Sequence, residues 1–347
     1  FGVVNEELSI YMKQELCEKI IDKIGINVVQ NDRLKFSIKL DNNIYNKLNV
    51  ENLFIETTRI STKFNFAYRG DAIFISLLKE QVEKLSSEQK AGNEFIFRVT
   101  SRPKEATEIA KSICDTYQNE EVNVFACGGD GTCFEVINGL IGSKNVNFGI
   151  IPVGSCNDFL KTFPNRPFLK ISEQIKAHPI VIDVIKVDDE YSLNVANFGF
   201  DAKSNYDQIK YRKVFKSIKK AYNFALLKNF LSPKLGDKVE IKVDDKLVFD
   251  GKSLLINVAN AKYYGGGFKC APYADCQDNL LEFMVVKKVS PITFLKMVKY
   301  YKKGEHLDNP KFKNILKYCR GKKIQIRGKN DKEIVGCLDG ETRIKKE

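Results

Sequence analysis

The chain has 347 residues, of which 43% are hydrophobic and 29% are charged; this composition indicates a globular protein long enough for two domains. No stretch approaches the ~18 apolar residues of a transmembrane helix, so we expect a soluble chain rather than an integral membrane protein. The formal net charge of +12 suits an anionic partner: a membrane surface, a nucleotide phosphate or a nucleic acid.

The first 61 residues give only local patterns. Glu15–Ile24 has the periodicity of an amphipathic helix, and Arg33–Leu40 reads as a strand. We therefore expect a small α+β segment at residues 1–61. A role in dimerisation or partner binding is one hypothesis, and a divergent RNA-binding module is another.

Residues 62–178 alternate between the strand and helix periods. Helices are predicted at Ile75–Leu85, Lys104–Thr116 and Thr132–Ile141, and strands at Glu94–Val99, Val122–Ala126 and Phe148–Val153. This βαβα order predicts an α/β domain with a parallel sheet.

A glycine turn, Gly128-Gly129-Asp130-Gly131-Thr132, links the strand at Val122–Ala126 to the following helix. Glycines let a backbone approach an anion closely, and a helix N-terminus attracts negative charge. Asp130 would oppose a phosphate unless a Mg²⁺ ion or a reacting hydroxyl requires a carboxylate there. The alternative is an ordinary glycine turn without a ligand.

A second turn, Gly154 to Phe159, follows the strand at Phe148–Val153 and contains Ser155, Asn157 and Asp158. Asn157 and Asp158 could simply cap a helix. Parallel strands, however, place such turns at one sheet edge, where open α/β sheets bind ligands. Two turns with a helix between them therefore favour a site.

Residues 179–347 are richer in short strands, which predicts an antiparallel β-sandwich. The expected strands are Ile180–Val187, Tyr191–Gly199, Val239–Val243, Lys246–Phe249, Lys252–Asn260, Leu280–Val286 and Lys323–Arg327, with a hairpin turn at Asp244-Asp245. Between them, Tyr211–Leu231 mixes apolar residues with Lys213, Lys216, Lys219 and Lys220. A basic amphipathic helix of this kind can lie on a membrane, and the alternative is a packed helix with a solvated lysine face.

Together, the two turns resemble those of the diacylglycerol kinase catalytic family, which includes soluble bacterial lipid kinases, sphingosine kinases and ceramide kinases. Further motifs follow in the family's order over about residues 62–347. They are Thr100–Ala110, Asn197–Ala202, Tyr264–Phe268 with Ala271-Pro272, Asp278–Leu281, Gly304–His306 and Leu338–Glu341. The resemblance implies an ATP-dependent lipid kinase with an N-terminal α/β nucleotide domain at 62–178. It also implies a C-terminal β-sandwich at 179–347 that carries the lipid site and whose end packs back on the first domain.

The resemblance also implies roles for individual residues. Glu341 would be the general base, or would orient the lipid hydroxyl, and Asp130 and Asp158 would hold the catalytic Mg²⁺ or its water network. A second, structural Mg²⁺ would bind the Asp278 carboxylate and the carbonyls of Asp275 and Leu280. ATP would contact Gly128, Gly129, Asp130, Gly131, Thr132, Ser155 and Asn157, with Thr100 near its base or ribose.

Three further expectations concern partners and alternatives. The nine cysteines lack Cys-x-x-Cys spacing, and with no signal peptide at Phe1–Glu7 they indicate a cytoplasmic protein with reduced thiols. We expect this protein to bind anionic membranes peripherally and to bind no nucleic acid. The family's first phosphate loop has only the altered counterpart Asn65–Gly70. This departure supports a second hypothesis, a weakly active, membrane-binding or regulatory relative. An NAD kinase-like enzyme is a further alternative, because NAD kinases share a Gly-Gly-Asp-Gly turn.

Overall fold

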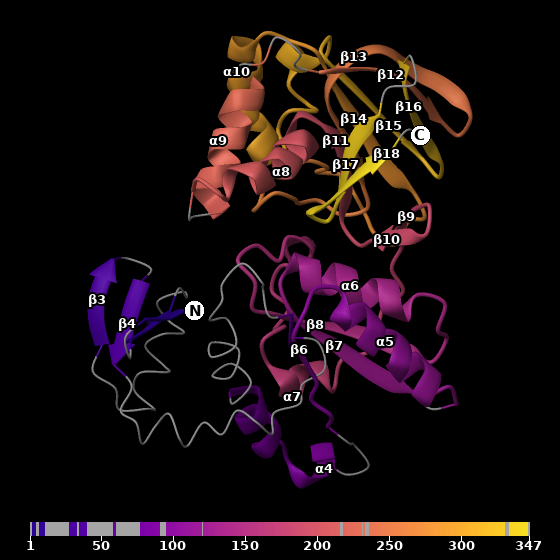
Figure 1. Cartoon of the computed structure of the whole chain (residues 1–347). Helices are drawn as coiled ribbons and strands as arrows, with labels where there is room; N and C mark the ends of the chain where they lie inside the picture. The colour runs from indigo at the N-terminus through magenta and orange to yellow at the C-terminus, as the bar shows by residue number, and fades with distance from the viewer. Residues whose placement is uncertain are drawn as a thin grey trace. The chain divides into compact units, whose positions relative to one another are not determined.

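The computed structural model describes short strands near the N-terminus and most of the chain after residue 77 (Figure 1). The described residues are 2–4, 7–10, 28–32, 35–39, 58–59, 77–90, 95–119, 121–215, 218–230, 232, 236–329 and 333–345. The chain forms two compact units that interleave along the sequence. One unit comprises 1–128, 139–152 and 167–179, and the other comprises 129–138, 153–166 and 180–347.

The described N-terminal residues form a four-stranded antiparallel sheet. Its order is β1 (Gly2–Val4), β2 (Glu7–Ile10), β4 (Lys35–Lys39) and β3 (Val28–Asp32). The strand expected at Arg33–Leu40 is therefore present as β4. The helix expected at Glu15–Ile24 and the loop Asn65–Gly70 lie outside the described residues.

The first unit also contains the predicted parallel strands. β5 (Thr58–Arg59) pairs in parallel with β6 (Val99–Thr100), and β7 (Val122–Gly128) pairs in parallel with β8 (Val146–Pro152). Helix α6 (Asp130–Leu140) connects β7 to β8 along the chain, and α5 (Glu105–Thr116) precedes β7. A helical crossover is the connection that parallel neighbours require. The α/β prediction is confirmed, although the strand expected at 94–99 shares only Val99 with β6.

Several apolar side chains of this unit pack together and hold its shorter helices. Residues 77–83 are helical, as expected, and are followed by α4 (Ser87–Lys90); α7 (Ile171–Gln174) comes later in the chain. Leu78 packs in one core with Cys127 of β7, Ile151 of β8 and Ile171 of α7. This core holds the ends of β7 and β8, after which the two predicted turns begin.

The second unit is built on an eight-stranded sheet whose pairs are all antiparallel. Its main path runs β15 (Leu316–Gly321), β14 (Leu281–Lys287), β13 (Lys246–Ala259), β11 (Val195–Gly199), β17 (Ile334–Leu338) and β18 (Glu341–Lys345). β12 (Asp237–Val243) pairs with β13 and with β16 (Ile324–Gly328). A separate hairpin joins β9 (Ile185–Val187) to β10 (Glu190–Ser192). The predicted antiparallel C-terminal half is confirmed.

Strand β13 differs from the prediction because it is one strand of 14 residues rather than two. Its first part pairs with β12 and its second part with β11 and β14, with a register shift between Ser253 and Leu255. The predicted turn before it is present, since Asp244 and Asp245 have φ angles of 47° and 62°. Such left-handed pairs are typical of tight hairpins.

The two faces of the sheet have separate cores. Ile256 and Val258 of β13 belong to a core that also contains Phe134 of α6. Leu255 and Ala259 point into the other core, with residues of α8 (Phe200–Tyr211) and α10 (Pro291–Lys303) packed in it or against it. Residues that alternate along a strand face opposite sides of a sheet, so the sequence places apolar residues on both. In Figure 1, α8, α10 and α9 (Ile218–Phe230) lie together beside the sheet.

The basic segment at 211–231 is not one helix. α8 ends at Tyr211 and α9 begins at Ile218. Phe224 of α9 packs on the rings of Tyr211 and Phe215, with centroids 4.9 and 5.2 Å away, yet its neighbour Leu227 is 56% exposed. Lys216 and the side chain of Lys219 lie outside the described residues, whereas Lys213 and Lys220 are exposed. The segment therefore has both a packed side and a basic, partly apolar surface.

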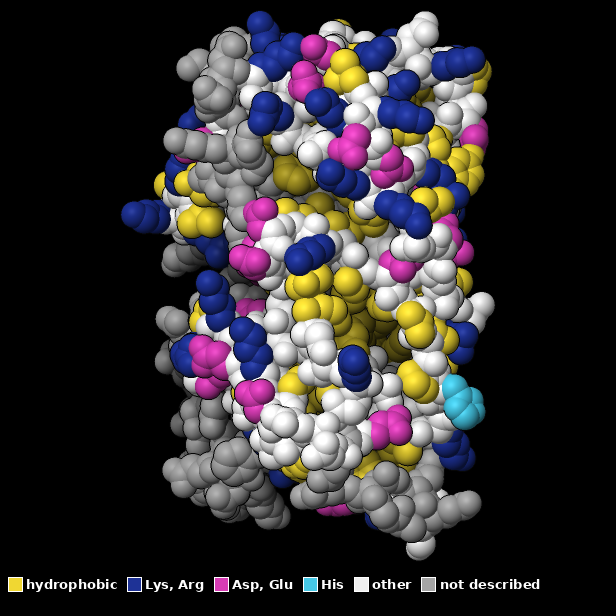
Figure 2. All heavy atoms as spheres, turned by 90° about the vertical axis from the view of Figure 1, so that its right-hand side faces the viewer, with side chains coloured by type: hydrophobic (Ala, Val, Ile, Leu, Met, Phe, Trp, Pro, Cys, Tyr) yellow, Lys and Arg dark blue, Asp and Glu magenta, His cyan; other side chains and the backbone are white. Residues whose placement is uncertain are grey.

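The face drawn in Figure 2 has mixed surface charge, and the described helices include no membrane-spanning one. Figure 2 shows Lys and Arg side chains spread over one face of the molecule among Asp and Glu side chains, rather than gathered in one patch. Among the described residues, no helix is long and apolar enough to cross a bilayer. The eight cysteines with described placement are all free thiols.

Candidate functional site

The two turns predicted to form a site are in contact. A Cβ atom built on Gly154 would lie 2.2 Å from the Cα atom of Gly129 and 3.0 Å from its nitrogen. Real Cβ atoms do not approach backbone atoms so closely, so Gly154 is the residue that allows the second turn to touch the first. A Cβ atom on Gly129 would meet the Cα atom of Gly154 at 3.3 Å, which is a milder contact.

Asp130 joins the two turns through its carboxylate. It is the first residue of α6, and its Oδ2 and Oδ1 atoms accept hydrogen bonds from the backbone N–H groups of Asn157 (2.9 Å) and Asp158 (2.7 Å). Burial, reinforced by the neighbouring Asp158 carboxylate, raises the pKa of Asp130 above its usual range. Hydrogen bonds from two backbone amides oppose this rise. Asp130 therefore positions the second turn and also contributes a carboxylate beside Asp158.

Asp158 is not an ordinary helix cap. The short helix after it, Phe159–Thr162, receives no side-chain capping bond from Asp158. Its buried carboxylate instead accepts a hydrogen bond from the N–H of Gly266 (2.7 Å) and pairs with the ammonium group of Lys161. Asn157, the residue before Asp158, has a φ angle of 46° and turns the chain at that point. Asp158 therefore does not cap this helix with its side chain, and both carboxylates accept bonds from outside their own turns.

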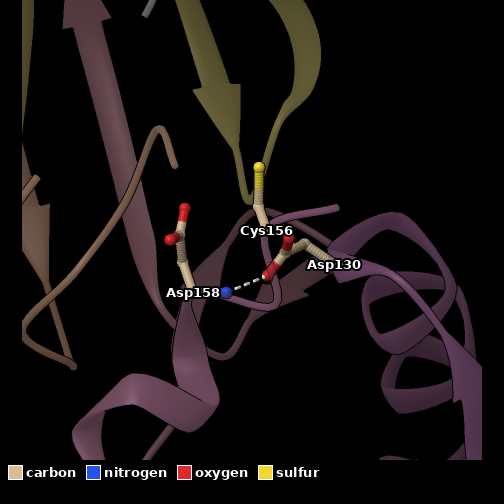
Figure 3. Close-up of side chains that lie close together, drawn as sticks. All are labelled: Asp130, Cys156 and Asp158. Carbon is tan, nitrogen blue, oxygen red and sulfur yellow. Dashed lines mark hydrogen bonds between the residues drawn. The ribbon is translucent and has the colours of Figure 1, made fainter. Parts of the chain in front are cut away.

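A thiol completes this group. Figure 3 shows Cys156 beside Asp130 and Asp158, and one ligand atom of each residue lies within 4.8 Å of the other two. Burial and the two carboxylates raise the pKa of Cys156, which keeps the thiol protonated. The two carboxylates are the hard oxygen donors that Mg²⁺ prefers, whereas a neutral thiol is not. The donor set thus fits a Mg²⁺ ion held by Asp130 and Asp158.

The glycine loop that holds Asp158 is a tight hairpin between Tyr264 and Phe268. These two residues exchange backbone hydrogen bonds of 3.0 and 2.9 Å. The three glycines between them have φ angles of 60°, 84° and 103°, a conformation that other L-residues rarely adopt. The glycines therefore form a turn whose central N–H, that of Gly266, points to the Asp158 carboxylate.

The turn before Glu341 is anchored by Asp339. The Asp339 carboxylate accepts hydrogen bonds from the N–H groups of Leu193 (2.7 Å), Asn194 (3.2 Å) and Val195 (2.9 Å). Burial raises the pKa of Asp339 to about 6, and the negative charge of Asp130 adds to the shift. Glu341 follows as the first residue of β18 and is half-buried. The backbone that carries Glu341 is thus fixed to strand β11.

The predicted structural metal site forms a different loop, before β14. Asp278 Oδ1 accepts the N–H of Leu280 at 3.0 Å, while its Oδ2 pairs with Arg320. Asp275 is exposed and accepts the N–H of Gln277 at 3.1 Å. The metal role of Asp275, Asp278 and Leu280 stays a prediction. The guanidinium group of Arg320 already lies beside the Asp278 carboxylate.

Not all the predicted residues gather at the two turns. Gly129, Ser155, Asn157, Asp130 and Asp158 lie there, and Gly131 and Thr132 form the first turn of α6. Gly128 ends β7, and the buried Thr100 ends β6. Sequence reasoning missed the parts played by Lys161 and Gly266. Gly266 stood in a recognised glycine motif, but its bond to Asp158 spans 108 positions of sequence.

Comparison with known proteins identifies two domains in the chain. Residues 74–187 match the diacylglycerol kinase catalytic domain, and residues 194–345 match the YegS C-terminal NAD kinase beta sandwich-like domain. A diacylglycerol kinase of Bacillus subtilis is 30% identical over 283 residues, which cover 78% of this chain and 89% of the relative. A diacylglycerol kinase of Staphylococcus saprophyticus is 29% identical over 277 residues, covering 78% and 85%.

Solved structures agree in fold. The crystal structure of a diacylglycerol kinase from Bacillus anthracis superposes with a TM-score of 0.55 at 22% identity, covering 77% of this chain and 85% of that one. At this identity the likeness shows the fold alone. The matched domains and the identity to the Bacillus subtilis protein over most of both chains show that this chain belongs to the diacylglycerol kinase catalytic family.

Proposed function

We propose that this protein is an ATP-dependent lipid kinase that transfers the γ-phosphoryl group to the hydroxyl of diacylglycerol or a related lipid. The observation that carries the proposal is the pair of carboxylates at two touching glycine turns, Asp130 and Asp158. The names of the relatives, diacylglycerol kinases, support the lipid as the acceptor.

In this proposal Asp130 and Asp158 hold Mg²⁺ or its water ligands, and the metal neutralises charge on the triphosphate. Gly128, Gly129 and Gly131 leave room for phosphates beside the backbone. Thr132, Ser155 and Asn157 would bind phosphate or ribose oxygens, and Thr100 would lie near the base or ribose. Ser155 is exposed, which leaves its hydroxyl accessible to a nucleotide.

Glu341 is proposed to accept the proton of the lipid hydroxyl or to orient that hydroxyl. General-base catalysis needs a carboxylate held in place rather than one on a mobile loop. Besides Asp339, the side-chain amide of Asn205 fixes this turn, since it donates to the carbonyl of Gly340 (2.7 Å) and the hydroxyl of Thr342 (3.0 Å). This proposed role is supported by hydrogen bonds to the residues on both sides of Glu341, which hold its backbone in place.

The substrate is insoluble, so we further propose that the protein is cytoplasmic and docks on anionic membranes. Exposed Lys213 and Lys220 flank the start of α9, where Phe224 and Leu227 are also partly exposed. Each lysine near an anionic surface contributes about 1 kcal/mol to such docking. A nucleic acid is not an expected partner. A homodimer through residues 1–61 stays a hypothesis.

The deciding experiment incubates the purified chain with labelled ATP, Mg²⁺ and a panel of lipids, and separates the products by thin-layer chromatography. We expect a labelled phospholipid from diacylglycerol or a related lipid. A reaction with NAD in place of the lipid tests the NAD kinase-like alternative. The domain matched by residues 194–345 is described as NAD kinase beta sandwich-like, which motivates this arm. Nucleotide binding without any phosphorylated product would support the regulatory alternative and contradict a kinase.

A further inference from the structure

We infer that Asp201 and Tyr264 are positioning residues for the Asp130–Asp158 pair, acting through the glycine hairpin at 264–268. This inference rests on the proposed function for its catalytic consequence, but its structural part is independent of that function. Neither residue belongs to the two glycine turns. Asp201 is the second residue of α8, and Tyr264 begins the hairpin.

A directed chain of hydrogen bonds ends on the Asp201 carboxylate. The side-chain amide of Asn257 donates to the Tyr301 hydroxyl, Tyr301 donates to the Tyr264 hydroxyl at 3.2 Å, and Tyr264 donates to Asp201 Oδ2 at 2.9 Å. Asp201 Oδ1 accepts the N–H of Ala202 at 2.8 Å. Asn257 and Tyr301 are buried, so a donor left unpaired here loses a bond that water cannot readily replace.

The buried surroundings give these side chains the protonation states that the series of hydrogen bonds requires. Burial raises the pKa values of Tyr264 and Tyr301 well above their ordinary range, so both phenols remain donors. Burial also raises the pKa of Asp201 to about 6, against hydrogen bonds from Asn197 and Tyr264 that favour the charged form. Near pH 7 the carboxylate is therefore mainly charged and accepts the Tyr264 proton.

The other end of the hairpin reaches the site. Gly266 donates its N–H to Asp158 Oδ2, and the Asp158 N–H donates to Asp130 Oδ1. A Cβ atom on Gly267 would lie 3.6 Å from the Lys161 ammonium nitrogen, which pairs with the same aspartate. The hairpin has three consecutive residues at positive φ, is closed by the Tyr264–Phe268 bridge, and packs the Phe268 ring on Tyr301 with centroids 6.1 Å apart. The hydroxyl bond from Tyr264 to Asp201 adds a directional anchor at its first residue, which we infer fixes where the Gly266 N–H points.

The test uses Tyr264→Phe, which removes one hydroxyl and little volume. Tyr273→Phe is the matched control, because the Tyr273 hydroxyl also donates to an aspartate, Asp308, but outside this chain of bonds. Amide hydrogen exchange, followed by mass spectrometry, is measured on peptides that cover residues 264–268. We expect exchange there to accelerate at least about tenfold in Tyr264→Phe and to stay within about twofold of wild type in Tyr273→Phe. Unchanged exchange in a folded Tyr264→Phe variant overturns the inference, whatever the enzyme does.

The functional consequence is read from the Mg²⁺ dependence of the reaction. In Tyr264→Phe we expect about tenfold more Mg²⁺ at half-maximal rate, together with a lower kcat. A partially unfolded sample would instead lower kcat alone, because the remaining folded molecules would keep their Mg²⁺ requirement. Asp201→Asn, which retains an acceptor oxygen, should restore much of what Asp201→Ala loses. A wild-type chain that phosphorylates no lipid would defeat the proposed function and still leave the exchange result to decide the inference.

Discussion

Gly154 offers a sharp test of the site because a single methyl group should separate its two turns. In Gly154→Ala the new Cβ atom would start 2.2 Å from the Cα atom of Gly129, whereas ordinary contacts begin near 3.4 Å. The obstacle is backbone, so a side chain cannot swing away to relieve it. The turns must move apart by about 1 Å.

That movement is enough to break the bonds of Asp130. Its bonds to the N–H groups of Asn157 and Asp158 measure 2.9 and 2.7 Å, and a further 1 Å takes both beyond hydrogen-bonding range. Hydrogen bonds to a charged group contribute about 1.5–3 kcal/mol each, so losing both should lower the unfolding free energy by about 3–6 kcal/mol. Turnover should fall by about 10²-fold or more, since the Mg²⁺ carboxylates lose their spacing.

Gly129→Ala is the matched control, because its Cβ atom would meet the Cα atom of Gly154 at 3.3 Å and needs only a few tenths of an ångström. Neither glycine has a positive φ, so the two variants differ in steric contact alone. Chemical denaturation would be measured on both variants, and lipid phosphorylation on Gly154→Ala alone, because Gly129 is itself proposed to lie beside the phosphates. Equal losses of stability in the two variants would refute the proposed contact between the turns.

The remaining predictions concern charge and protonation. Asp130→Asn should cost about 1–3 kcal/mol of stability and about 10²-fold or more in turnover, and near-normal turnover in the folded variant would reject the Mg²⁺ role. Glu341→Gln should lower kcat far more than nucleotide affinity measured by calorimetry; parallel losses would make it a nucleotide or structural residue. Burial lowers the pKa of the fully buried His306 to about 4 in the folded protein. As the pH falls, this histidine is therefore protonated in the unfolded chain before it is protonated in the folded chain. Relative to His306→Phe, the wild type should therefore lose up to about 3 kcal/mol of stability between pH 6.5 and 4, and parallel denaturation profiles would contradict this. Replacing Lys213 and Lys220 by Gln should weaken sedimentation with anionic vesicles, most at low salt, without changing nucleotide binding; salt-insensitive binding to neutral vesicles would exclude the electrostatic mode.

The sequence predicted the elements whose signals are local. The glycine turn at 128–132 located the start of α6 within two residues, because glycine conformation and helix entry depend on near neighbours. Two strands were predicted where the structure has the single strand β13, and Gly251, which stands between them, pairs within the ladder with Val239. β17 was not predicted, and Gly336 stands at the centre of this short strand. A Cβ atom there would lie 2.7 Å from the Phe198 ring, so this glycine is required by a neighbouring strand.

The site was predicted in part for the same reason. Its two turns carry recognisable residues, so Asp130 and Asp158 were identified as candidates. The surroundings of Asp158 could not be, because the decisive bond comes from Gly266 and depends on how distant segments fold together. A capped helix and a ligand carboxylate have the same local sequence, and only the hydrogen-bond partner distinguishes them.

The interleaving of the two units has a consequence for how the molecule can be divided and how it folds. Residues 129–138 belong to the second unit, where Phe134 enters the sheet core and Asn138 exchanges hydrogen bonds of 2.7 and 2.8 Å with the backbone of Tyr191. A fragment cut at residue 180 would carry the whole sheet and still lack these groups. Such a fragment should aggregate on expression, and adding a peptide of residues 129–138 should partly restore its solubility. During synthesis, α6 must also wait for strands made more than fifty residues later, which favours slow folding governed by long-range contacts.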